Sequence, residues 1–74
     1  NPSTKISWKS SVGSHQTLKI YNILGTEVAT VVDEYKPAGS YEVNFDASNL
    51  SSGVYLYRLQ SGGNIITKKM TILK

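Results

Sequence analysis

The 74-residue sequence contains no cysteine, so neither a disulfide framework nor a thiolate metal site can stabilise its fold. A chain of this length buries only about 60 % of the surface that its unfolded form exposes, which is near the lower limit for folding without such help. The sequence also lacks any apolar run that approaches the roughly 18–20 residues of a membrane span. We therefore expect one domain at most, held together by a compact apolar core.

The charge pattern lacks the features of a nucleic-acid-binding surface. Eight basic and five acidic residues give a net charge of +3, but the basic residues are scattered and only Lys68 and Lys69 are adjacent. Successive side chains of a strand point to opposite faces, so these two lysines cannot form one patch. No arginine-rich or aromatic-interleaved segment is present that could follow a phosphate backbone. The lysines are therefore interpreted as solvating side chains, and no nucleic-acid partner is predicted.

Helical periodicity is missing, whereas a period of two recurs between turn signals. The alternation predicts strands over 4–8, 17–24, 27–35, 40–45, 54–60 and 65–73. Turns are expected at Gly25-Thr26, at 36–39 and at 61–64, because glycine and proline favour the required backbone angles. Val31-Val32 interrupts the alternation and predicts a bulge. This pattern is typical of an all-β, immunoglobulin/fibronectin-III-like antiparallel β-sandwich of about six to seven strands.

The inward rows of these strands supply the expected core. Its predicted members are Ile6, Trp8, Leu18, Ile20, Val28, Val32, Tyr41, Val43, Phe45, Leu50, Tyr55, Tyr57, Leu59, Ile66, Met70 and Ile72. Gly53 and Tyr55 in LSSGVYLYRL are predicted to form a structural corner. This grouping resembles a tyrosine corner, in which the phenol hydroxyl bonds back to the backbone. The same Gly-x-Tyr spacing occurs at Gly39-Ser40-Tyr41.

No catalytic, cofactor-binding or metal-binding residues are predicted. His15 is the only histidine, and we place it in the polar loop SSVGSHQ. Asp33 and Glu34 alternate across a strand and cannot act as a facing pair of carboxylates. Asp46 opens DASN, which an Asx-turn explains without a calcium ion. We therefore expect a non-enzymatic domain that needs no cofactor.

The chain closes with KKMTILK, which is predicted to be a strand that pairs with residues 54–60. Several segments together resemble a known family: NPST-x-I at 1–6, LKIYNILGTEVATVV at 18–32, PAGSYEVNFDASNLSSGVYLYRL at 37–59, and KKMTILK at 68–74. The chain is similar to the type A C-terminal sorting domain of the type IX secretion system. That family usually begins with a Pro-Asn-Pro-Phe-like segment, of which Asn1-Pro2 remains. The opening NPST also lacks the pattern of a signal peptide. We interpret residues 1–74 as a single sorting domain excised from a larger secreted protein.

The resemblance implies a C-terminal secretion signal. Its expected partners are the type IX translocon, a surface signal peptidase and an N-terminal cargo domain, with the isolated domain a monomer. The cargo would reach the cell surface or the medium through the periplasm and the outer membrane, with cleavage upstream of residue 1. Translocon recognition is assigned to Lys68, Lys69, Met70, Ile72, Leu73 and Lys74. Edge-strand lysines also protect against aggregation, and the sequence leaves both roles open.

Two other functions stay open at this point. The first is an immunoglobulin-like accessory, spacer or carbohydrate-binding module of a secreted enzyme, which a planar row of exposed aromatic side chains would favour. The candidates for that row are Trp8, Tyr21, Tyr35 and Tyr57. The second is an assembly role, because flagellar hook-capping proteins carry a similar sandwich.

Overall fold

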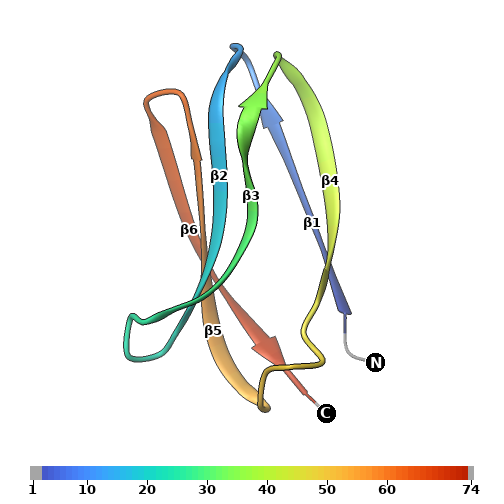
Figure 1. Ribbon diagram of the computed structural model, residues 1–74, viewed down its shortest axis with the longest axis vertical. Coiled ribbons are helices and arrows are strands. Elements are labelled where there is room, and N and C mark those ends of the chain that lie inside the picture. Colours follow the sequence, from blue (N-terminus) through green and yellow to red (C-terminus); the bar gives the residue numbers. More distant parts are fainter. Residues whose placement is uncertain (1–2, 74) are drawn as a thin grey trace.

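The computed structural model describes residues 3–73, so the predicted features at Asn1, Pro2 and Lys74 lie outside the described residues. This part of the chain contains no helix and forms the strands β1 (Ser3–Ser10), β2 (Ser14–Asn22), β3 (Glu27–Lys36), β4 (Gly39–Asp46), β5 (Gly53–Ser61) and β6 (Asn64–Ile72) (Figure 1). All pairings between them are antiparallel. The predicted all-β architecture is confirmed.

The strands form two sheets that face each other as a sandwich (Figure 1). One sheet contains β1 and β4, and the other has the order β3-β2-β5-β6. The chain crosses from one sheet to the other after β1, after β3 and after β4. Apolar side chains of both sheets meet in the space between the sheets and form the core. The last strand pairs with β5 from Ser61↔Asn64 to Gly53↔Ile72, as the sequence predicts.

Most of the predicted core is confirmed. The buried apolar residues are Ile6, Trp8, Leu18, Ile20, Val32, Phe45, Ala47, Tyr55, Leu59 and Ile72. Tyr41, Val43, Leu50, Tyr57 and Met70 pack against them and are partly buried. The prediction omitted Ala47, and it was wrong for Val28 and Ile66, which are exposed.

The β-bulges of β3 explain the exposure of Val28. The predicted bulge is present, because Leu18 pairs with Val32 and Lys19 pairs with Thr30, which leaves Val31 without a residue opposite. The register shifts again where β2 passes from Ile20 to Tyr21, and this shift leaves out Val28. A bulge inserts one extra residue and re-aims the side chains next to it. Strict alternation counted back from the buried Val32 would turn Val28 inward, but the bulge at Val31 reverses this phase and turns Val28 outward.

Ile66 is exposed because β6 is the outermost strand of the larger sheet. It lies directly opposite Leu59, so both side chains point to the same face of the sheet. Leu59 is 5 % exposed and Ile66 is 46 % exposed. The two-stranded sheet therefore covers β5 at this level but leaves β6 uncovered.

The first hairpin turn begins earlier than predicted. The Asn22 side-chain Oδ1 accepts hydrogen bonds from the amides of Leu24 and Thr26 at 3.0 and 2.9 Å, so β2 ends at Asn22. Gly25 has a φ of 86°, the left-handed conformation that glycine adopts at little cost. At its other end, β2 begins at Ser14, so His15 lies in a strand opposite Tyr35 and not in the predicted loop.

Candidate functional site

Four of the predicted recognition residues, Lys68, Lys69, Met70 and Ile72, lie in the edge strand β6, but they do not share one surface. Lys68 lies opposite Tyr57 and Lys69 opposite Leu56, so the two lysines project from opposite faces of the sheet. Ile72 is buried and Met70 is packed against the core, whereas Leu73 follows the strand and is exposed. Lys74 lies outside the described residues.

The lysines of β6 differ from most other lysines in their charge environment. Lys5, Lys19 and Lys36 lie 3.6, 3.3 and 3.1 Å from the carboxylates of Glu42, Glu27 and Glu34. Within residues 3–73, Lys68 and Lys69 have no such carboxylate partner. Their side chains are exposed, so their charges are available to a partner molecule.

Gly53 and Tyr55 lie at the corner that leads into β5. The Tyr55 ring is buried, and its hydroxyl donates a hydrogen bond to the carbonyl of Ser51 at 2.8 Å. This is the arrangement of a tyrosine corner. The Tyr41 hydroxyl donates in the same way to the carbonyl four residues before it, that of Pro37. The corner at Tyr55 ties down the loop before β5, and β5 in turn carries the whole length of β6.

His15 and Asp46, two titratable residues that the sequence singled out, both make structural contacts. His15 Nε2 lies 2.6 Å from Asp33 Oδ1, and both side chains are exposed on neighbouring strands. The amide of Ser48 donates to Asp46 Oδ1 at 2.9 Å, which is the predicted Asx-turn. Among residues 3–73, no group of three or more His, Cys, Asp or Glu side chains could hold a metal ion.

A buried polar cluster at one end of the sandwich was missed by the sequence analysis. Trp8 Nε1 donates to Gln16 Oε1 at 2.8 Å, and the Ser10 and Ser61 hydroxyls lie 2.8 Å apart. Gln16 is fully buried. It lies two residues before Leu18 in β2 and therefore points inward as Leu18 does. This alternation is the signal from which its burial could have been predicted. A polar residue in an inward row needs a partner on a facing strand, and the sequence does not identify that partner.

The four aromatic candidates for a ligand-stacking row do not form one. Trp8 is buried and packs on Tyr41, with ring centroids 5.7 Å apart. Tyr21 and Tyr57 are partly buried on opposite faces of the larger sheet, and the Arg58 guanidinium lies 5.3 Å from the Tyr21 ring. Tyr35 is exposed on a different strand. These residues therefore do not supply a planar platform for a sugar ring.

No helix long and apolar enough to cross a membrane occurs in the described part of the chain. A family model described as the secretion system C-terminal sorting domain matches residues 1–73. The comparisons with curated proteins and with solved structures gave no significant match.

Proposed function

Because the chain belongs to the family of secretion system C-terminal sorting domains, we propose that it directs a cargo protein through the type IX translocon across the outer membrane. The match over residues 1–73 is the observation that carries this proposal. The family is a C-terminal signal for type IX secretion and marks proteins for the cell surface or the extracellular space. Such a signal acts on the secretion system and on the cargo attached at its N-terminal side.

The finer steps of export form part of the proposal. Residues 1–74 are one sorting domain at the C-terminal end of a larger secreted protein. After translocation, a surface signal peptidase removes the domain by cleavage upstream of residue 1. The domain itself performs no chemical reaction, because the family to which it belongs acts as a sorting signal.

The residues at the C-terminus have two proposed roles: some contact the translocon, and others fix the strand to the core. Lys68, Lys69 and Leu73 are exposed and are proposed to contact the translocon directly, together with Lys74. Met70 and Ile72 contact the core, and their role is to fix the strand against β5. The lysines also prevent two copies from pairing through this edge, because like charges on an exposed strand oppose such pairing.

A reporter fusion tests the proposal. The domain is fused to the C-terminus of a fluorescent protein that folds in the periplasm, and the fusion is expressed in a host with the type IX machinery. The expected result is fluorescence in the medium or at the cell surface, and its retention in the periplasm when the translocon gene is deleted. Retention of a folded fusion in the intact host would contradict the sorting function. The reporter without the domain is the matched control.

A further inference from the structure

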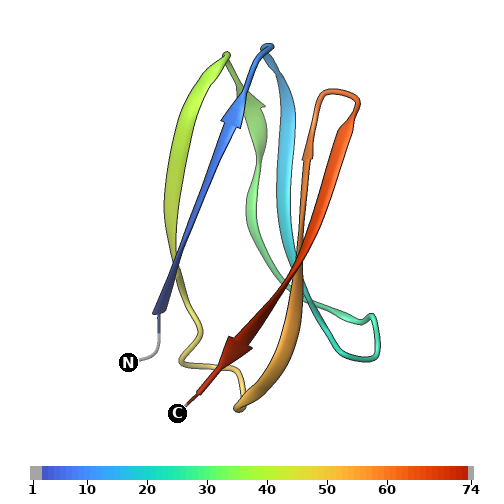
Figure 2. The ribbon, with the colours of Figure 1, turned by 180° about the vertical axis from the view of Figure 1, so that it is seen from behind.

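Three surface hollows follow one another between β1 and β6, and we call this line of hollows the β1–β6 seam. Their volumes are about 170, 230 and 240 Å³. Lys9 and Ile66 line the first hollow together, and Ser3 and Ile72 line the last. Residue numbers rise along β1 while they fall along β6, so the two strands run past each other in opposite directions (Figure 2). The seam is long enough to follow most of β1.

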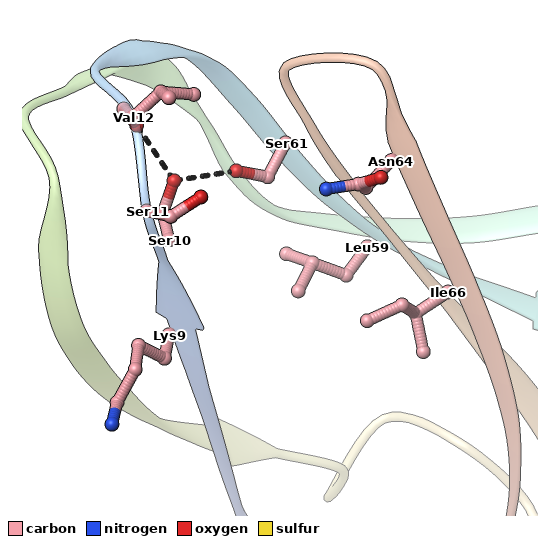
Figure 3. Close-up of a pocket in the computed structure, with 8 residues that line it drawn as sticks. All are labelled: Lys9, Ser10, Ser11, Val12, Leu59, Ser61, Asn64 and Ile66. Atoms are coloured by element: carbon pink, nitrogen blue, oxygen red, sulfur yellow. Dashed lines mark hydrogen bonds between the residues drawn. The ribbon is translucent and has the colours of Figure 1, made fainter.

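The floor of the seam is apolar. In the first hollow, the side chains of Leu59 and Ile66 extend toward the space below the hydrogen bond between Ser10 and Ser61 (Figure 3). In the middle hollow, Ile66 is joined by residues of β1 and β5, which are Ile6, Trp8, Tyr57 and Leu59. Ile66 continues the inward row of the larger sheet, yet nearly half of its surface is exposed. A segment that covered this row would bury apolar surface, which is favourable in water.

Both borders of the seam carry free backbone groups. In the described part of the chain, β1 pairs with β4 alone and β6 with β5 alone. A strand edge of this kind offers N–H and C=O groups to a further strand. A strand added to β1 would extend the smaller sheet above the inner face of β6, where Ile66 is uncovered. Extended peptides bind other proteins by such strand addition, in which pockets read alternate side chains.

The charges at the seam favour an acidic occupant. Lys9 of β1 and Lys68 of β6 line the middle hollow, and neither has a carboxylate partner within residues 3–73. The Lys9 side chain points away from the floor (Figure 3), on the side where an added strand would place its outward row. A second copy of the chain would bring the same lysines to the seam and add repulsion. Lys68 shares the inner face of β6 with Ile66, so an outward row of carboxylates on the added strand would pair with Lys9.

We propose that the β1–β6 seam binds an extended acidic segment of a partner protein by strand addition to β1. Apolar side chains of that segment lie over Ile66, and its carboxylates, which alternate with them, lie beside Lys9. This binding site is additional to the sorting function and uses contacts that need no export machinery. Binding is measured in solution, so its result does not depend on whether a fused reporter is secreted.

The test uses a synthetic peptide of eight residues, matched to the length of β1, in which valine alternates with glutamate. Titration into the purified 74-residue chain is followed by nuclear magnetic resonance, and the expected shifts fall on the amides of β1 and on Ile66. Two control peptides accompany it. One replaces each glutamate by lysine, and the other carries N-methyl groups at alternate residues, which remove backbone donors but keep the charges.

Paired variants locate the site. Lys9→Gln is expected to weaken binding about two- to fivefold, as for one partly screened ion pair. Lys19→Gln removes the same charge from the outer face of the larger sheet and is expected to change affinity by less than about twofold. Ile66→Thr is expected to weaken binding about three- to tenfold through lost apolar contact. The control Ile65→Thr, next to it on the opposite face, leaves binding unchanged.

Three results would overturn the proposal. The first is binding of the lysine peptide as tight as that of the glutamate peptide, because the charges would then have no role. The second is equal binding of the N-methylated peptide, which would reduce the contact to unspecific attraction between charges. The third is a stable dimer in sedimentation analysis that protects the β1 amides, because a second copy would then be the occupant.

Discussion

The indole nitrogen of Trp8 donates a hydrogen bond to Gln16 Oε1 across 2.8 Å, and this contact joins β1 of the smaller sheet to β2 of the larger one. Both side chains are buried, and Gln16 has no exposed surface. The bond therefore fixes the two sheets relative to each other at the end of the sandwich where β1 connects to β2.

Replacement of Gln16 by leucine should destabilise the fold by about 1–3 kcal/mol, because the buried Trp8 N–H loses its acceptor. The free energy of unfolding is measured by urea denaturation followed through tryptophan fluorescence. The exposed Gln60→Leu variant serves as control and should stay close to the parent. A Gln16→Leu variant as stable as the parent would mean that the hydrogen bond contributes nothing net.

Phe45→Ala should cost about 3–5 kcal/mol, since it empties a buried position of β4 and leaves a cavity. That loss is enough to unfold most of the molecules of a small domain. A thermal melt followed by circular dichroism should show a much lower midpoint or no transition. Leu24→Ala, at a position that is 86 % exposed, should melt like the parent. Unchanged melting of Phe45→Ala would remove Phe45 from the core.

Loss of the Tyr55 hydroxyl should be smaller but measurable. Tyr55→Phe keeps the buried ring and removes the bond to the Ser51 carbonyl, so we expect a loss of about 0.5–1.5 kcal/mol. Tyr35→Phe tests the same chemical change at an exposed ring and should have no comparable effect. Amide hydrogen exchange of β5 and β6 should rise in Tyr55→Phe if the corner holds the C-terminal hairpin. Equal exchange in both variants would argue against that role.

His15→Ala should leave the fold intact. It removes an exposed contact between the imidazole and the Asp33 carboxylate, and exposed polar contacts of this kind contribute about 0–1 kcal/mol. It should also remove no activity that can be assigned to the domain. Circular dichroism checks the fold, and a panel of hydrolase substrates checks the activity. A hydrolytic activity that disappears with this one substitution would show that the non-enzymatic assignment is wrong.

The simultaneous change of Lys68, Lys69 and Lys74 to glutamine should separate folding from export. The strand keeps its length and its backbone bonds, and exposed charges contribute little to stability, so the melting temperature should stay nearly constant while export of a fused reporter falls. The matched control changes Lys5, Lys19 and Lys36 to glutamine. It alters the net charge equally at lysines that have carboxylate partners, and it should still be exported.

Deletion of residues 70–74 tests the structural role of the C-terminal strand. It removes the buried Ile72 together with the backbone pairs that Met70–Ile72 make with β5. Stability and export should therefore fall together. Normal export by the folded lysine variant would leave those lysines with edge protection alone.

Local alternation was enough to predict the six strands and most of the inward rows, because successive side chains of a strand point to opposite faces whatever the strand pairs with. Turn chemistry gave the hairpin at Gly62-Gly63, which brings β6 against β5. Strand boundaries were less well predicted. The side chain of Asn22 ends β2 through two hydrogen bonds that a count of apolar residues does not register.

The sequence by itself determined which face most residues take, with Val28 beside the bulges as an exception, and the family to which its segments belong. Only the tertiary structure decided whether a given face is covered. Leu59 and Ile66 sit opposite each other in the same inward row, yet one is buried and the other half exposed. The physical reason is that burial depends on the strand order of both sheets. A two-stranded sheet placed against a four-stranded one leaves an outer strand of the larger sheet in contact with water.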